Sequence, residues 1–356
     1  MRVALVGPPQ SGKSTLFAAV AEAGGSGVDL SRPDQTHLAV VKVPDERLGW
    51  LAELEKSKKI TPAELEFLDV PGFDLSDQAG RDRARAHWQE MQQSDMIVFV
   101  VAGFSAPSAA PYRGRVDPAA DVDELVNEML FADLERVTNR IDKLEATLKK
   151  PVPNRDELLR EQALMQRLHD ALEAGKPIAE AIHAETESKL VRSFQFLTLK
   201  PTIVALNCGE DQAGQPGPGE LSGLPVIQLS AEIEEEIAQL DEAERGEFLA
   251  DLGLAAPARD RLIQACYERL DLVSFLTAGP TESRAWSLPA GTDAVTAAGA
   301  IHTDIARGFI RAEVVAYDDL VAAGTHKAAK AAGKVRLEGK HYTVRDGDVI
   351  LFRFNV

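Results

Sequence analysis

The chain has 356 residues, of which 45% are hydrophobic and 27% are charged, and its formal net charge is −17 at pH 7. This length and apolar content predict two or three folded units with compact cores. The negative charge excludes general binding of nucleic acid, because the summed field repels a phosphate backbone, and any RNA contact must be a local patch.

The residue pattern excludes further classes of protein. No stretch contains the roughly 18 apolar residues that a membrane helix needs, and the first residues lack the zones of a signal peptide. Cys208 and Cys266 are the only cysteines and lie far apart, which argues against a disulfide framework and against a zinc site. We therefore expect a cytoplasmic protein without membrane contact. The sequence leaves the oligomeric state open, with a monomer expected.

Short apolar runs rich in β-branched residues alternate with helical patterns along much of the chain. The runs occupy residues 2–7, 64–72, 95–104, 201–207 and 224–231. This rhythm is typical of an α/β fold with a mostly parallel sheet.

A phosphate-binding motif follows the first run. Residues 7–14 have the sequence GPPQSGKS, which fits G-x-x-x-x-G-K-[ST], and a helical pattern comes next. In this P-loop, backbone N–H groups wrap the phosphates at a helix N-terminus. Lys13, the predicted catalytic residue, adds a positive charge at the β- and γ-phosphates, and the Ser14 hydroxyl is a magnesium ligand. We expect Lys13 on an exposed loop, so that its replacement leaves the fold intact. The predicted nucleotide contacts here are Gln10, Ser11, Gly12, Lys13, Ser14 and Thr15.

A D-x-x-G element, Asp69-Val70-Pro71-Gly72, ends the second run. Such an element places a carboxylate near magnesium and a glycine N–H near the γ-phosphate. Asp69 is therefore predicted to hold magnesium through water, and Gly72 to contact the nucleotide. Alone the motif is usually only a turn, and the P-loop before it supports the functional interpretation. Phe73 follows where many GTPases have a water-orienting glutamine, so hydrolysis lacks that aid.

A long helical pattern separates the third and fourth runs. Residues 150–154 contain two prolines and interrupt it, and a second helical pattern ends near Gly175. We predict an antiparallel helical hairpin inserted at residues 121–189, with an ordinary packed helix pair as the alternative. The apolar residues of the first pattern form a heptad seam: Leu130, Leu134, Val137, Ile141, Leu144 and Leu148.

The fourth run ends in Asn207-Cys208-Gly209-Glu210, at the sheet edge where open α/β folds bind ligands. An N-K-x-D element reads guanine at this place in GTPases, but Glu210 is one methylene longer than aspartate and Cys208 cannot supply the lysine stem. Guanine selectivity is therefore doubtful, and a solvated turn is the alternative. Ser230 and Ala231, after the fifth run, would form the last loop beside the base.

After Leu272 the pattern changes to short strands and turns, with Asp346-Gly347-Asp348 between strand-like residues 341–345 and 349–356. We predict a separate small α+β domain at residues 273–356, which leaves residues 1–120 and 190–272 for the nucleotide-binding domain. Basic residues of this tail form either a footprint for RNA or the ribosome or a charge-balanced surface. They are Arg307, Arg311, Lys327, Lys330, Lys334, Arg336 and Lys340.

With these residues in order, the chain resembles the YchF family, the Obg-like ATPases. The likeness covers nearly the whole chain, through GPPQSGKSTLF, VVKVPDERL, DLERVTNRIDKLE, FLTLKPTIVALN and the tail from TAGPTESRAWSLPAGTDAV to GKHYTVRDGDVILFRFNV. The resemblance implies a GTPase-like core, an inserted helical hairpin and a β-grasp tail of the TGS type. It also implies ribosome association, magnesium as cofactor, and ATP favoured over GTP through an N-x-x-E element that Asn207 and Glu210 match.

The departures from the family pattern fall in the switch regions. Thr36 is only a weak candidate for the threonine of the first switch, and the second switch, residues 73–81, is compressed and charged. A family histidine has no counterpart near Pro111 and Tyr112. The chain is thus expected to be a divergent member or a paralogue with altered switches.

Three functions fit the sequence. One is a slow, magnesium-dependent ATPase that acts as a ribosome-associated or translation-linked regulator, without an identifiable side-chain base. The alternative is a nucleotide-gated adaptor with negligible hydrolysis, or a GTPase that prefers GTP.

Overall fold

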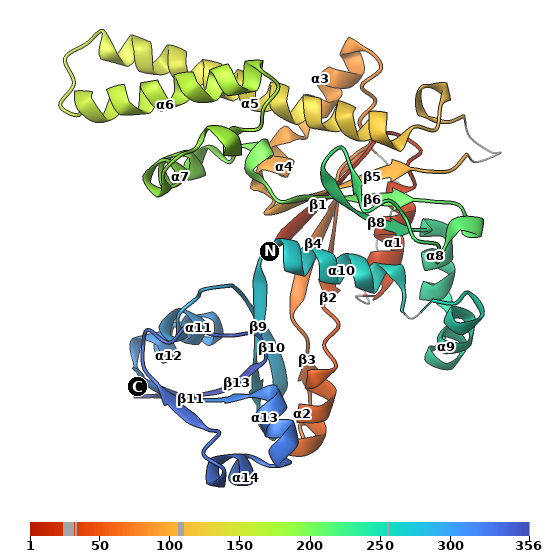
Figure 1. Ribbon diagram of the computed structural model, residues 1–356, viewed down its shortest axis with the longest axis vertical. Helices are drawn as coiled ribbons and strands as arrows, with labels where there is room; N and C mark the ends of the chain where they lie inside the picture. Colours follow the sequence, from red (N-terminus) through yellow and green to blue (C-terminus); the bar gives the residue numbers. More distant parts are fainter. Residues whose placement is uncertain (24–31, 33, 106–109, 255, 356) are drawn as a thin grey trace. The chain divides into compact units, whose positions relative to one another are not determined.

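The computed structural model describes residues 1–23, 32, 34–105, 110–254 and 256–355 (Figure 1). Contacts divide the chain into two compact units, each built from two stretches of sequence. Unit 1 comprises Met1–Ala39 and Glu66–Leu262, and unit 2 comprises Val40–Leu65 and Ile263–Val356. Within the described ranges, no helix combines the length and the apolar character required to cross a membrane.

Unit 1 contains a seven-stranded sheet with the strand order β2-β4-β1-β5-β6-β8-β7. The β1–β4, β1–β5, β5–β6 and β6–β8 pairs are parallel, and β7 and β8 are antiparallel. The predicted α/β fold with a mostly parallel sheet is confirmed. The strands are β1 (Arg2–Val6), β2 (His37–Lys42), β4 (Glu64–Asp69), β5 (Met96–Ala102), β6 (Thr202–Asn207), β7 (Glu220–Leu221) and β8 (Leu224–Leu229).

Helices bury the faces of this sheet. Side chains of a strand alternate between the two faces, and Ala4 and Val6 of β1 share an apolar core with Val122 and Leu125 of α5. The helices are α1 (Lys13–Ala23), α3 (Gln78–Ala86), α4 (Trp88–Gln93), α5 (Pro118–Leu148), α6 (Arg155–Glu173), α7 (Glu185–Val191), α8 (Ala231–Gln239), α9 (Glu242–Asp251) and α10 (Ala258–Arg269), with α10 running into unit 2. Short 3-10 turns lie at Tyr112–Gly114, Ile178–Ala181, Arg192–Phe194, Leu197–Leu199 and Glu210–Gln212.

Helices α5 and α6 run side by side as the two arms of a hairpin (Figure 1). Val137, Ile141 and Leu144 of the predicted seam are buried against Leu164 and Leu168 of α6. The first half of α5 instead packs on the sheet. Helix α5, which has 31 residues, therefore contributes to two apolar cores. It starts at Pro118, three residues before the predicted hairpin boundary at residue 121.

Unit 2 contains a six-stranded sheet with the order β12-β11-β13-β9-β10-β3. Phe275, Phe309 and Phe352 form its core together with the small residues Ala294 and Ala297 of α11. The elements are α2 (Arg47–Glu55), β3 (Ile60–Thr61), β9 (Leu272–Ala278), β10 (Ser283–Pro289), α11 (Ala294–Ile301), α12 (Thr303–Arg307), β11 (Phe309–Ala316), α13 (Tyr317–Ala323), α14 (His326–Ala331), β12 (Arg336–Glu338) and β13 (Asp348–Phe354).

Residues 40–65 join the C-terminal segment in unit 2, whereas the sequence assigned them to the nucleotide-binding domain. Helix α2 packs on β9 and β10 and buries Leu48 and Leu51. The turn at Asp346 and Gly347 is present, but residues 341–345 form no strand and contribute a single bridge from Thr343 to Asp293. The strand predicted there was wrong, because β13 pairs with β9 and β11 instead.

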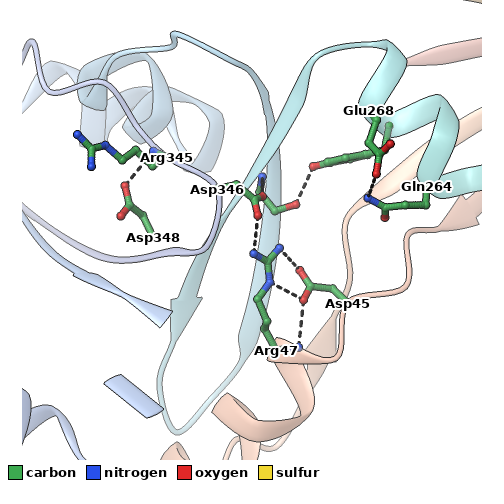
Figure 2. Close-up of polar contacts among 9 residues, drawn as sticks. Asp45, Arg47, Gln264, Glu268, Arg345, Asp346 and Asp348 are labelled. Carbon is green, nitrogen blue, oxygen red and sulfur yellow. Dashed lines mark hydrogen bonds and ion pairs between the residues drawn. The ribbon is translucent and has the colours of Figure 1, made fainter. Parts of the chain in front are cut away.

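A polar cluster fastens residues 45–47 to the turn before β13 (Figure 2). Arg47 forms a fork with Asp45 through Nε and Nη2, both at 2.8 Å, and its Nη1 lies 2.7 Å from Asp346 Oδ2. Asp346 Oδ1 also accepts the Ser274 N–H at 2.8 Å. The two carboxylates raise the pKa of Arg47 above its ordinary value. Arg47 therefore stays charged, and it joins stretches that are about 300 residues apart in sequence.

Candidate nucleotide-binding site

The P-loop requires glycine at two positions. A Cβ at Gly7 would meet the Val100 carbonyl oxygen at 2.2 Å, and one at Gly12 would meet Asn207 Nδ2 at 2.0 Å. Gly12 also has a φ of 79°, and Gln10 a φ of 65°, a region that favours glycine. Helix α1 begins at Lys13, so its first N–H groups face the loop, as the phosphate-binding interpretation requires.

Lys13, Ser14 and Asp69 come together where β1 and β4 end. The Lys13 ammonium forms an ion pair with Asp69 Oδ1, and the Ser14 hydroxyl donates to Asp69 Oδ2 at 3.2 Å. The side chains of Lys13 and Asp69 are each only 6% exposed. The expectation that Lys13 lies on an exposed loop was therefore wrong, because its ammonium is buried in an ion pair with Asp69 at the end of β4.

The segment after β4 fastens to the P-loop through its backbone. The Phe73 N–H donates to the Gly7 carbonyl at 3.0 Å, and a Cβ at Gly72 would lie 3.4 Å from the Pro9 Cα. The Phe73 ring is buried in the sheet core, so it does not stand in for a water-orienting glutamine.

Asn207 braces the loop instead of facing solvent. Its Nδ2 donates to the Ser11 carbonyl at 3.0 Å, and its Oδ1 accepts the Ala231 N–H at 2.8 Å. One buried amide therefore connects the P-loop to the loop after β8. Cys208 is buried, which raises the pKa of its thiol, while Glu210 is exposed on a 3-10 turn.

The donor set fits a magnesium ion beside phosphates. Ser14 Oγ and Asp69 Oδ2 are hard oxygen atoms within one hydrogen bond of each other. Among the described side chains, the buried Ser11 Oγ and Ser230 Oγ have no hydrogen-bond partner, and an unpaired buried hydroxyl calls for a ligand to satisfy it.

Other predicted residues lie apart from this cluster or carry no contact with it. The Thr36 hydroxyl donates to Glu90 of α4 at 2.7 Å. It is therefore bonded to a carboxylate outside the cluster of Lys13, Ser14 and Asp69. Thr15 lies in the first turn of α1, half-buried. Tyr112 and Arg113 both contact the segment after Gly72, although no sequence motif marks them.

Three of the seven basic residues of the tail are paired. Lys334 contacts Asp319 at 2.9 Å, Arg307 contacts Asp304 at 3.3 Å, and Arg336 contacts Glu338 at 3.2 Å. These pairs balance part of the basic charge on that surface.

Comparison with known proteins agrees with this architecture at both ends of the chain. A family model named YchF-GTPase_C, described as a protein of unknown function (DUF933), matches residues 272–355. A model described as a 50S ribosome-binding GTPase matches residues 2–140. The ribosome-binding ATPase YchF of Bacillus subtilis is 39% identical over 99% of this chain and 98% of its own length. The chain belongs to the YchF family.

Further relatives extend the family likeness across kingdoms. The Obg-like ATPase 1 of Oryza sativa subsp. japonica is 33% identical over 100% of this chain and 92% of its own. The solved structure of the Schizosaccharomyces pombe YchF GTPase has a TM-score of 0.85 and 27% identity, covering 99% of this chain and 97% of that one. The two relatives are named as ATPases, whereas the Schizosaccharomyces pombe protein is named as a GTPase.

Proposed function

We propose that this YchF protein is a slow, magnesium-dependent ATPase. The observation that carries the proposal is the buried ion pair of Lys13 and Asp69, with the Ser14 hydroxyl bonded to the same carboxylate, at the end of a glycine-dependent P-loop. The relatives named as ATPases support ATP as the nucleotide.

The chain's own residues supply charge and position. Lys13 would exchange its contact with Asp69 for the β- and γ-phosphate oxygens and stabilise charge that develops on them. Ser14, and Asp69 through water, would hold a magnesium ion, which when bound neutralises phosphate charge. The predicted contacts from Gln10 to Thr15 and at Gly72 would orient the phosphates. Asn207 would keep Ser11 and Ala231 at the spacing that the nucleotide needs, with Ser230, Ala231 and Glu210 on the base side.

A second candidate is an adaptor that binds ATP with negligible turnover. The burial of Phe73 in the sheet core favours it, since this residue cannot orient a water molecule. The experiment is hydrolysis of radiolabelled ATP by purified protein, with Lys13→Met as the control for contaminating ATPases. Turnover that depends on Lys13 supports the ATPase. Tight binding of ATP without such turnover supports the adaptor, and absence of ATP binding refutes both.

We also propose that the protein associates with the ribosome through the α5–α6 hairpin, with the C-terminal unit as a further contact. The relatives named as ribosome-binding support this partner. Co-sedimentation with ribosomes, with and without ATP, is the test. Failure to sediment under either condition would refute the association.

A further inference from the structure

The segment after the D-x-x-G element is held by side chains from the loop before α5. The Leu75 N–H donates to the Tyr112 hydroxyl at 3.0 Å. The Leu75 carbonyl accepts from Arg113 Nη2 at 3.0 Å. Both backbone groups of one residue are thus fixed by two adjacent side chains.

The same two side chains reach helix α5. The Tyr112 hydroxyl donates to Glu124 Oε2 at 3.2 Å, and the Arg113 guanidinium forms an ion pair with Glu124 Oε1. We call Tyr112, Arg113 and Glu124 the Leu75 latch. It connects the switch segment to the first turns of α5 through charge-assisted contacts, which are stronger than neutral ones.

One residue of the Leu75 latch, Arg113, has an energetically costly backbone conformation. Arg113 has a φ of 52° inside a 3-10 turn, a conformation that a non-glycine residue keeps only when its surroundings impose it. Here the guanidinium supplies that constraint, because it contacts Leu75, Glu124 and the Tyr112 ring, 5.6 Å away.

On the other side, the switch segment is tied to the P-loop. Phe73 bonds to Gly7, and the side chains of Phe73 and Leu75 are both buried in the sheet core. Any displacement of residues 72–75 by a γ-phosphate must therefore either pull on the latch or break it. Since α5 is continuous from Glu124 to the hairpin core at Val137 and Leu144, a shift at its start would be passed along the helix to the hairpin.

We propose that Tyr112 and Arg113 are positioning residues for nucleotide hydrolysis, which hold Leu75 and hence Gly72 against the P-loop, and that Glu124 transmits the position of this segment to α5. This inference rests on the proposed ATPase function. Tyr112 and Arg113, in the loop before α5, would thus position the switch segment, whereas the P-loop residues would contact the phosphates.

Two substitutions test whether the Leu75 latch acts on hydrolysis or only on the stability of the fold. Tyr112→Phe keeps the ring and removes the hydroxyl. Arg113→Gly removes the guanidinium and its contacts, but it also relieves the positive-φ backbone, which limits the loss of stability. Tyr267→Phe is the matched control, because it removes a tyrosine hydroxyl that contacts Ser274 in unit 2.

Three measurements are made on each full-length variant. Calorimetry gives the Kd for ATP, single-turnover assays give the hydrolysis rate constant, and hydrogen exchange follows the Leu75 amide and residues 118–133 with and without a non-hydrolysable ATP analogue. We expect an ATP Kd within about threefold of wild type, since no phosphate contact is removed. We expect hydrolysis about twofold to tenfold slower in both latch variants, the effect of one or two lost hydrogen bonds.

Exchange at Leu75 should become about fivefold faster in Tyr112→Phe. The analogue should change exchange in residues 118–133 of wild type and of Tyr267→Phe, and this response should be lost in both latch variants. Wild-type hydrolysis rates in Tyr112→Phe and Arg113→Gly, or an unchanged response of α5, would overturn the latch alone. Absence of ATP binding by wild type would instead refute the proposed function, and the positioning role with it.

Discussion

The ion pair between Lys13 and Asp69 makes a nucleotide-binding residue important for stability. Both side chains are 6% exposed, so Lys13→Met leaves a buried carboxylate without its cation. Removing one partner of a buried pair costs about 3 to 5 kcal/mol. We expect about 3 kcal/mol here, at the low end, because the Ser14 hydroxyl still donates to Asp69.

The decisive comparison is with a variant that removes both charges. Lys13→Met with Asp69→Asn replaces the ion pair by two neutral groups of similar size, which is often nearly neutral for stability. The double variant should therefore recover all but about 1 kcal/mol of the wild-type stability. Neither variant should gain stability from magnesium-ATP, because binding of a ligand to the folded state alone is what raises stability.

The assay is denaturant unfolding of nucleotide-free protein, followed by tryptophan fluorescence. Trp88 lies in unit 1, and Trp50 and Trp286 lie in unit 2, so a background with Trp50→Phe and Trp286→Phe reports unit 1 only. If Lys13→Met unfolds at the wild-type midpoint, or the double variant is no more stable than Lys13→Met, the buried pair does not contribute as argued.

Three further predictions concern the base, the unit boundary and the thiols. Glu210→Asp should narrow a preference for ATP over GTP by about tenfold, measured as melting shifts at matched nucleotide concentrations; a wild type that already prefers GTP tenfold would refute adenine selection by this loop. Cys208→Lys, which would restore the lysine of N-K-x-D, should destabilise the protein because position 208 is 3% exposed. Removing residues 274–356 should make the remaining chain aggregate, since α2 loses β9 and β10 and exposes Leu48 and Leu51; a soluble, monomeric product in gel filtration would contradict the division into units. Burial raises the pKa of both Cys208 and Cys266, so neither should react with a thiol reagent in mildly alkaline buffer until denaturant is added, and rapid labelling of the folded protein would contradict that burial.

Local residue patterns were sufficient to predict the strands and helices whose own sequence has a distinct apolar run or periodicity. The five apolar runs became β1, β4, β5, β6 and β8, and the heptad seam became α5. Lys13, Ser14 and Asp69 met as the P-loop and D-x-x-G motifs imply, because parallel strands bring their carboxyl ends to one edge.

The features that the sequence did not reveal depend on contacts between residues that are far apart along the chain. Residues 40–65 contain an amphipathic helix, but nothing local indicates that Leu48 and Leu51 pack on strands more than two hundred residues later. Lys13 is buried in an ion pair with Asp69, which lies 56 residues later in the chain. Residues 341–345 form no strand, because β13 pairs with β9 and β11 instead. The amide of Asn207 was predicted at the base, whereas its hydrogen bonds connect Ser11 and Ala231.

The composition of unit 2 from two separate stretches has a consequence for synthesis. Residues 40–65 leave the ribosomal tunnel about 200 residues before Ile263, the start of their partner stretch. At translation rates of roughly 5 to 20 residues per second, that interval lasts roughly 10 to 40 s. During this time the nascent chain carries Leu48 and Leu51 without the strands that bury them. The early stretch must therefore stay unfolded or be shielded by a chaperone, and slow codons between positions 65 and 263 would lengthen the exposure.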